Sequence, residues 1–238
     1  MTLSAEDYLA HLRALTTEFA EAANDGEANA PVPDCAGWTR ADLVTHLGGI
    51  HRWAAEIVRT GEPQQLSAAE VPGDLAAWYA ESAAMLLTAL EAADPAEKCW
   101  HFGGTPKTKA FWFRRQLHET AVHLIDLHGC AATTLVLDPV VAADGVDEVL
   151  TALLSRVTRW HAVPPLPEPI TLRATDTGDE WTVVPGEPPA VGEGEAAATV
   201  EASAQELLTL LWKRGEITPR VTGDEELARA FLKAPLTP

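Results

Sequence analysis

The sequence predicts an α+β protein of two domains, a helical N-terminal domain followed by a small α+β domain. Apolar residues recur at helical spacing through the first two thirds of the chain. The proline-rich stretch VPPLPEP, at 163–169, then interrupts this pattern and predicts a stiff, extended joint. Beyond it, short segments of alternating apolar and polar residues indicate strands. We therefore expect domains at 1–162 and 163–238.

Five helices are expected in the first domain. Ser4 and Thr39 are suited to cap the first two helices, and Thr39 forms a variant of the capping box with Asp42. Gly61 is expected to end the second helix. A loop containing Gly-Gly and proline excludes regular structure between the third and fourth helices. The last three helices are expected near 72–93, 110–129 and 139–161.

The second domain is expected to have the element order β-β-β-α-β-α. ITLRAT and WTVVP are predicted strands, and the turn DTGDE joins them into a hairpin. AATVEA predicts a third strand. Ser203 and Glu206 form a capping box that starts the helix AQELLTLLWKR. PRVTG and DEELARAFLKA predict the fourth strand and the terminal helix.

The charge and composition disfavour several classes of protein. The chain has 35 acidic and 17 basic residues, a net charge of -18, so its surface should repel nucleic acid and anionic membranes. It has no apolar run of the roughly 20 residues that cross a bilayer and no basic start typical of a signal peptide. Its 3 cysteines are scattered, which disfavours a disulfide framework. We expect a cytoplasmic protein.

The segment LHETAVHLIDLH nearly spells the zinc-protease signature His-Glu-x-x-His, but His118 and His123 are one residue too far apart. Because each helical residue turns the chain by about 100°, Glu119 and His123 lie on one face, and Asp126 is nearly eclipsed with Glu119. His118 and His128 each fall about 140° from His123, on different sides. The pair able to chelate a metal is therefore Glu119 with His123.

A third ligand must come from another helix, and His46 is the best candidate. It shares an apolar stripe with Leu43 and Trp53, so it should face the interior, whereas His51 should face elsewhere. Alone, His46 also fits a core histidine. Glu119 with His123 also fits a surface pair, although their apolar neighbours weaken that alternative.

Three inward ligands from two helices would leave positions open to water or substrate, as in catalytic rather than structural metal sites. A di-iron site is excluded because it needs two Glu-x-x-His helices, and the chain has no Glu-x-x-His. The sequence therefore favours a mononuclear site.

At GWTRADLVTHLGGIHRWAAEIV and FRRQLHETAVHLIDLH the chain resembles the mycothiol-dependent maleylpyruvate isomerase family, and the similarity covers nearly its whole length. The resemblance implies an actinobacterial protein with a DinB-like, up-down-down-up four-helix bundle. A small C-terminal domain similar to sterol carrier protein would follow the bundle. It also implies a divalent metal, usually zinc (Zn²⁺), held by His46, Glu119 and His123, the residues that helical geometry selects.

In the isomerase the metal would bind the thiolate of mycothiol, a low-molecular-weight thiol, and make it nucleophilic at neutral pH. The thiolate would add to the double bond of maleylpyruvate, allow rotation and leave, giving fumarylpyruvate. The resemblance assigns Asp126 to the site, where we expect it to act as an acid–base residue. It also assigns a C-terminal arginine, Arg214 or next Arg220, to the substrate carboxylates. The segments FRRQ and WKRG could supply a basic patch.

The expected function is thus that of a metal-dependent, mycothiol-using enzyme, either an isomerase or a thiol S-transferase, acting on a small-molecule electrophile. Two alternatives stay open. One is a metal-binding bundle with a hydrolytic or detoxifying role, and the other is a non-enzymatic module whose tail domain binds an apolar ligand. The partners would be the thiol and the electrophile, and the chain is expected to be a monomer or a weak dimer.

Overall fold

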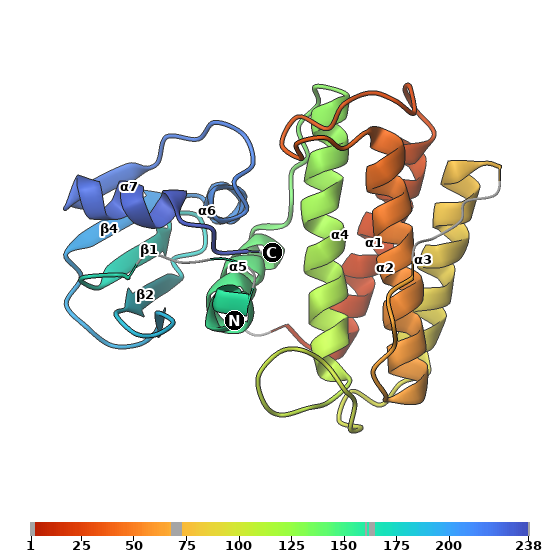
Figure 1. Cartoon of the computed structure of the whole chain (residues 1–238), viewed down its shortest axis with the longest axis horizontal. Coiled ribbons are helices and arrows are strands. Elements are labelled where there is room, and N and C mark those ends of the chain that lie inside the picture. The colour runs from red at the N-terminus through yellow and green to blue at the C-terminus, as the bar shows by residue number, and fades with distance from the viewer. Residues whose placement is uncertain (1–2, 68–72, 160, 162–164, 238) are drawn as a thin grey trace. The chain divides into compact units, whose positions relative to one another are not determined.

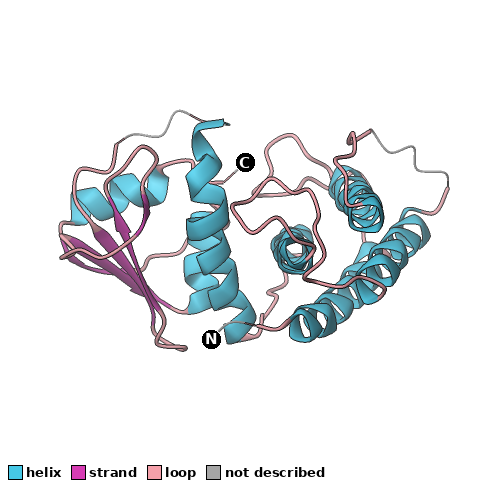
Figure 2. Cartoon of the chain, turned by 90° about the horizontal axis from the view of Figure 1, so that it is seen from below, coloured by secondary structure: helices cyan, strands magenta, loops and turns pink. Residues whose placement is uncertain are grey.

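The computed structural model of the chain describes residues 3–67, 73–159, 161 and 165–237. It divides into two compact units, one ending at Leu135 and the other beginning at Val136. The first unit contains helices and loops, whereas the sheet lies wholly in the second (Figure 2). The predicted fold class, a helical domain followed by a small α+β domain, is confirmed. None of the described helices is both long enough and apolar enough to cross a bilayer.

The N-terminal unit is a four-helix bundle. Its helices α1 and α4 run in one direction and α2 and α3 in the other, which gives the expected up-down-down-up order (Figure 1). Both α1 and α2 pack against α3 and α4, so α2 and α4 are neighbours. The bounds are α1 Ala5–Ala23, α2 Arg40–Thr60, α3 Leu75–Glu91 and α4 Ala110–Cys130.

The helix ends follow local chemistry that the sequence displays. Ser4 and Thr39 both form complete capping boxes, with Asp7 and Asp42 respectively. Gly61 ends α2 in the left-handed conformation, with φ 75°. The third helix begins at Leu75 because Asp74 accepts hydrogen bonds from the backbone N–H groups of its first turn; residue 72, where it was expected to start, lies outside the described residues.

The C-terminal unit contains a sheet whose described strands have the order β3-β2-β1-β4-β5. Strand β1 pairs in parallel with β4, and the other neighbours are antiparallel. The bounds are β1 Ile170–Ala174, β2 Glu180–Val184, β3 Ala190–Val191, β4 Ala198–Ala202, α6 Ala204–Leu211, β5 Arg220–Gly223 and α7 Glu225–Lys233. The strand β3 is an addition to the expected order. It has two residues, too few to show an alternation of apolar and polar side chains, and it forms only by pairing with β2.

The division between the units differs from the expected boundary at 162/163. The helix α5, Pro139–Glu148, lies in the C-terminal unit, where it packs against α6. Its Asp147 accepts a hydrogen bond from the indole of Trp181 on β2, at 3.1 Å. After α5 the chain continues as a π-helical turn, Val149–Leu153, and a 3₁₀ turn, Leu154–Arg159. Residues 162–164 lie outside the described residues, so the expected joint at 163–169 is described only in part.

Gly48 of α2 packs closely against the indole of Trp78 on α3. A Cβ added at Gly48 would come closer to the ring than real Cβ atoms approach other atoms. We predict that Gly48→Ala lowers the free energy of unfolding by about 1–3 kcal/mol, because overpacking outweighs the gain in helix propensity. Urea unfolding measures the change.

The matched control is Gly129→Ala on α4, where the nearest atoms to the new Cβ lie 3.9 Å away. This variant should be no less stable than the wild type. Adding Trp78→Leu to Gly48→Ala should recover part of the loss. Equal stability of the two alanine variants would contradict the packing argument.

Candidate metal centre

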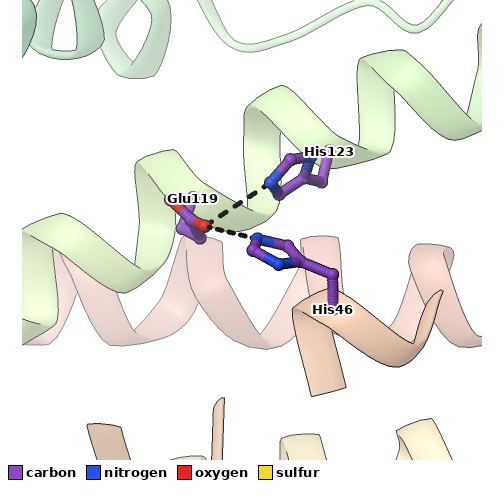
Figure 3. Close-up of side chains that lie close together, drawn as sticks. All are labelled: His46, Glu119 and His123. Carbon is purple, nitrogen blue, oxygen red and sulfur yellow. Dashed lines mark ion pairs between the residues drawn. The ribbon is translucent and has the colours of Figure 1, made fainter. Parts of the chain in front are cut away.

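Three side chains from two neighbouring helices of the bundle converge on one point. Glu119 and His123 lie one turn apart on α4, and His46 reaches them from α2 (Figure 3). Glu119 Oε1 lies 3.4 Å from Nε2 of His46 and 3.4 Å from Nε2 of His123. One ligand atom from each residue lies within 4.8 Å of the other two. The structure thus brings together the three residues that the sequence selected.

The donor set fits a divalent metal. Two imidazole nitrogens and one carboxylate oxygen suit zinc and similar borderline cations. A tetrahedral cation about 2.0–2.2 Å from two donors would hold them about 3.4 Å apart, and the carboxylate oxygen already lies 3.4 Å from each imidazole nitrogen. No large rearrangement would be needed to close these atoms around an ion. Among the described residues, this is the group that has such geometry.

The group lies at the edge of an open pocket in the bundle. The side chain of His46 is 33% exposed, whereas those of Glu119 and His123 are 16% and 9% exposed. The pocket has a volume of about 650 Å³, and His46 forms part of its wall. A small molecule could therefore approach the group from the side of His46. The other lining residues are Gly37, Trp38, Asp42, Thr45, Gly49, Ile50, Leu66 and Ser67.

Asp126 orients the ring of His123. Its carboxylate oxygen Oδ2 lies 2.9 Å from Nδ1 of His123, and its side chain is fully buried. A carboxylate on Nδ1 fixes the ring so that Nε2 faces Glu119 and His46. The thiol of Cys35 also donates to Oδ2, at 3.4 Å. The acid–base role expected of Asp126 stays a proposal, and its place behind His123 adds the orienting of this imidazole.

The charges of the site are tightly coupled. Burial raises the pKa of Glu119, but Arg115 and the hydrogen bonds from His123 and His46 outweigh it and hold the pKa well below its usual range. Burial lowers the pKa of His123, but hydrogen bonds to Asp126 and Glu119 outweigh it and raise the pKa to about 9. These shifts favour an ionised Glu119 next to a protonated His123.

Arg115 contacts the group, and the sequence alone does not predict this contact. The sequence predicts Arg115 only as part of a basic patch, yet its side chain is 4% exposed and its Nη2 lies 2.7 Å from Oε2 of Glu119. The signal was available in the spacing. Arg115 precedes Glu119 by four residues, the same interval that joins Glu119 to His123.

Trp38 covers the two histidines from the loop before α2. Its ring centre lies 4.9 Å from that of His46 and 6.2 Å from that of His123, to which it is nearly parallel at 19°. The two imidazoles lie edge to face, 5.0 Å apart. Trp38 therefore packs beside both imidazoles and also forms one wall of the pocket.

The remaining histidines of the two motifs lie outside the group. His51 is fully buried in the bundle, where Nε2 lies 3.1 Å from the hydroxyl of Thr120. His118 is also buried, and His128 lies 2.8 Å from the hydroxyl of Thr133. The sequence-based exclusion of these three residues agrees with this arrangement.

The two arginines assigned to substrate carboxylates belong to the C-terminal unit. Arg214 follows α6, and its Nη1 donates to the carbonyl of Trp212 at 2.9 Å. Arg220 lies on β5, is largely exposed and lies 3.5 Å from Glu201. Their role toward a substrate stays a proposal.

Comparisons with known proteins agree with the geometry. A family model described as the mycothiol maleylpyruvate isomerase N-terminal domain matches residues 9–128, and the model of the corresponding C-terminal domain matches 140–230. The chain belongs to the mycothiol maleylpyruvate isomerase family. The resemblance inferred from the motifs is therefore confirmed.

Two solved structures are similar to this family member. Both are crystal structures of the mycothiol-dependent maleylpyruvate isomerase, and one is a histidine-to-alanine mutant. The mutant is 15% identical with a TM-score of 0.68, and the other is 16% identical with a TM-score of 0.65. Each alignment covers 94% of this chain and 97% of the other, so the likeness extends over both units and shows a shared fold. No curated protein matches the chain.

His51 should make the stability of the bundle depend on pH. Burial lowers its pKa from 6.5 to about 3. Between these two pH values the unfolded chain binds a proton that the folded chain does not, so the free energy of unfolding falls as the pH falls. In EDTA, the wild type should lose about 2 kcal/mol more than His51→Gln between pH 7 and pH 5.

Urea unfolding of both proteins at the two pH values tests this, because the other titrating groups are common to both. Equal losses in the wild type and the variant would show that His51 does not bind a proton on unfolding.

Proposed function

We propose that this protein is a divalent-metal-dependent enzyme that uses mycothiol and activates its thiol for addition to a small electrophile, as a cis–trans isomerase of the maleylpyruvate type or as an S-transferase. The convergence of His46, Glu119 and His123 at an open pocket is the observation that carries the proposal. Membership of the mycothiol maleylpyruvate isomerase family supports the use of this thiol.

The metal would be held by Nε2 of His46, Oε1 of Glu119 and Nε2 of His123, and zinc is the cation that this donor set suits best. When bound, such a cation lowers the pKa of a thiol that coordinates to it, so that the nucleophilic thiolate is present at neutral pH. Three protein ligands leave room for this fourth partner, as in catalytic rather than structural sites.

The surrounding residues would prepare this site without reacting themselves. The hydrogen bond from His123 to Asp126 holds the imidazole ready to bind, which lowers the cost of ordering it. Trp38 packs beside both imidazoles and would help to hold their rings in place. Leu66 and Ile50 give the pocket apolar walls, while Thr45 and Ser67 offer hydroxyl groups to a polar cosubstrate. Arg214, or Arg220 in its place, is proposed to pair with substrate carboxylates.

Metal content tests the site directly. Wild-type protein purified without a histidine tag should contain close to one equivalent of divalent metal, and His46→Ala should lose most of it because one of three ligands is removed. Elemental analysis by mass spectrometry measures the content. His128→Ala is the matched control, since His128 lies on α4 outside the group and its loss should leave the content unchanged. A wild-type content below about half an equivalent that His46→Ala does not alter would contradict the metal site.

Turnover assays test whether the protein uses mycothiol and which reaction it catalyses. Metal-loaded protein is supplied with mycothiol and a panel of electrophiles that includes maleylpyruvate, and both cis–trans isomerisation and thiol consumption are followed. Either activity should fall to background in Glu119→Gln and His123→Gln, while His128→Ala keeps it. Isomerisation without thiol consumption identifies an isomerase, and consumption identifies a transferase. Turnover that does not require the thiol would refute its use and favour a hydrolytic role.

A further inference from the structure

Three residues of α4 form a continuous row. Arg115, Glu119 and His123 are spaced four residues apart, so each lies one turn beyond the last on nearly the same face of the helix. Because Cα–Cβ bonds in a helix tilt toward its N-terminus, the side chain of Glu119 leans toward Arg115 and that of His123 leans toward Glu119. The carboxylate of Glu119 therefore lies between a permanent cation and an imidazole.

The two oxygens of Glu119 have different partners. Oε2 accepts a hydrogen bond from Nη2 of Arg115 at 2.7 Å. Oε1 lies 3.4 Å from Nε2 of His46 and 3.4 Å from Nε2 of His123. Only Oε1 faces the two histidines, so the orientation of the carboxylate divides its oxygens between the arginine and the candidate metal site.

A change of partner for Oε2 of Glu119 would be energetically unfavourable. The guanidinium of Arg115 is buried, and its hydrogen bond to Oε2 is charge-assisted on both sides. To present both oxygens to a cation, Glu119 would have to rotate away from Arg115 and break this bond in an environment that screens charge poorly. Arginine suits the task because its charge is permanent and its planar donors have a fixed direction, so the carboxylate is held in one orientation.

We propose that Arg115 is a positioning residue that keeps Oε2 of Glu119 occupied and so restricts this ligand to a single oxygen, Oε1, toward a divalent cation. The inference rests on the metal site of the proposed function. Its consequence is a protein ligand set of two nitrogens and one oxygen, which keeps the coordination number low and a further position free for the thiol.

A purely structural role for Arg115 predicts something different. An i,i+4 ion pair can stabilise α4 without any influence on how a cation is bound. Removal of such a pair would lower the free energy of unfolding but leave the coordination of the metal unchanged. The number of ligands around the ion is therefore the quantity that separates the two roles.

Cobalt(II) is the probe for this quantity, because its visible d–d absorption is intense in four-coordinate sites and weak when the coordination number rises. The full-length wild type, Arg115→Gln and Arg115→Lys are each loaded with one equivalent of cobalt(II), and the molar absorptivity is measured. We expect an intense spectrum for the wild type and a several-fold loss of intensity in Arg115→Gln, since both oxygens of Glu119 become free to bind. Arg115→Lys should restore the intensity, because it returns a cation to Oε2.

The matched control is Arg52→Gln, which also removes one cation from the bundle. Arg52 lies on α2 and pairs with Glu81 and Ser82 of α3, so its loss should not alter the spectrum. Arg115→Met serves in place of Arg115→Gln if the glutamine variant does not fold, as judged by circular dichroism; the same loss of intensity is expected.

An unchanged spectrum in a folded, cobalt-loaded Arg115→Gln or Arg115→Met variant would overturn the role of Arg115 alone. So would a loss of intensity that Arg115→Lys does not reverse. A wild type that takes up no cobalt would instead refute the metal site on which the proposed function also depends. Failure of thiol turnover by metal-loaded wild type would leave the cobalt result intact, so the two proposals fail separately.

Discussion

The candidate metal centre between α2 and α4 depends on one largely buried carboxylate. Glu119 is mostly buried, and a buried carboxylate is strongly unfavourable unless its charge is compensated. Its compensation comes from three directions, with Arg115 on one oxygen and His46 and His123 facing the other. The charge of this carboxylate therefore explains why the guanidinium of Arg115 is buried and why the imidazoles of His46 and His123 both face Oε1.

The bundle topology makes this convergence possible. The up-down-down-up order places α2 beside α4 although a whole helix separates them along the chain. His46 lies in the second turn of α2, shortly after the capping box of Thr39 and Asp42 fixes where that helix begins. The buried Leu43 and Leu47 fix the rotation of α2 in the bundle, and with it the face on which His46 lies.

Helical periodicity was sufficient to predict most of the candidate site. It selected Glu119 and His123 and excluded His118 and His128, because azimuth decides which residues share a face. It could not give the direction in which a side chain points within that face. For this reason the hydrogen bond between Asp126 and Nδ1 of His123 could not be predicted from the sequence.

The missed features depend on tertiary contacts that leave little trace in the sequence. Trp38 precedes α2 in a loop, where no periodicity indicates its neighbours. The proline-rich stretch at 163–169 indicates a domain boundary, yet the two units divide at 135/136. They divide there because α5 packs against α6, and the composition of the chain does not indicate that contact. Capping residues, in contrast, act on their own helix, so Ser4 and Thr39 were predicted correctly.

The pocket wall is formed partly by a helix and partly by a connection between helices, and these two parts differ in how readily their residues can change. His46 lies on a rigid helix, and Glu119 and His123 lie on its neighbour, whereas Leu66 and Ser67 belong to the connection that follows α2. Connections tolerate substitution and changes in length far better than packed helices do. Substitutions at Leu66 and Ser67 could therefore change which molecules fit while the three converging side chains stay as they are. The pocket wall and the three converging side chains therefore lie on separable parts of the bundle, so the shape of the pocket can change while the group of side chains is kept.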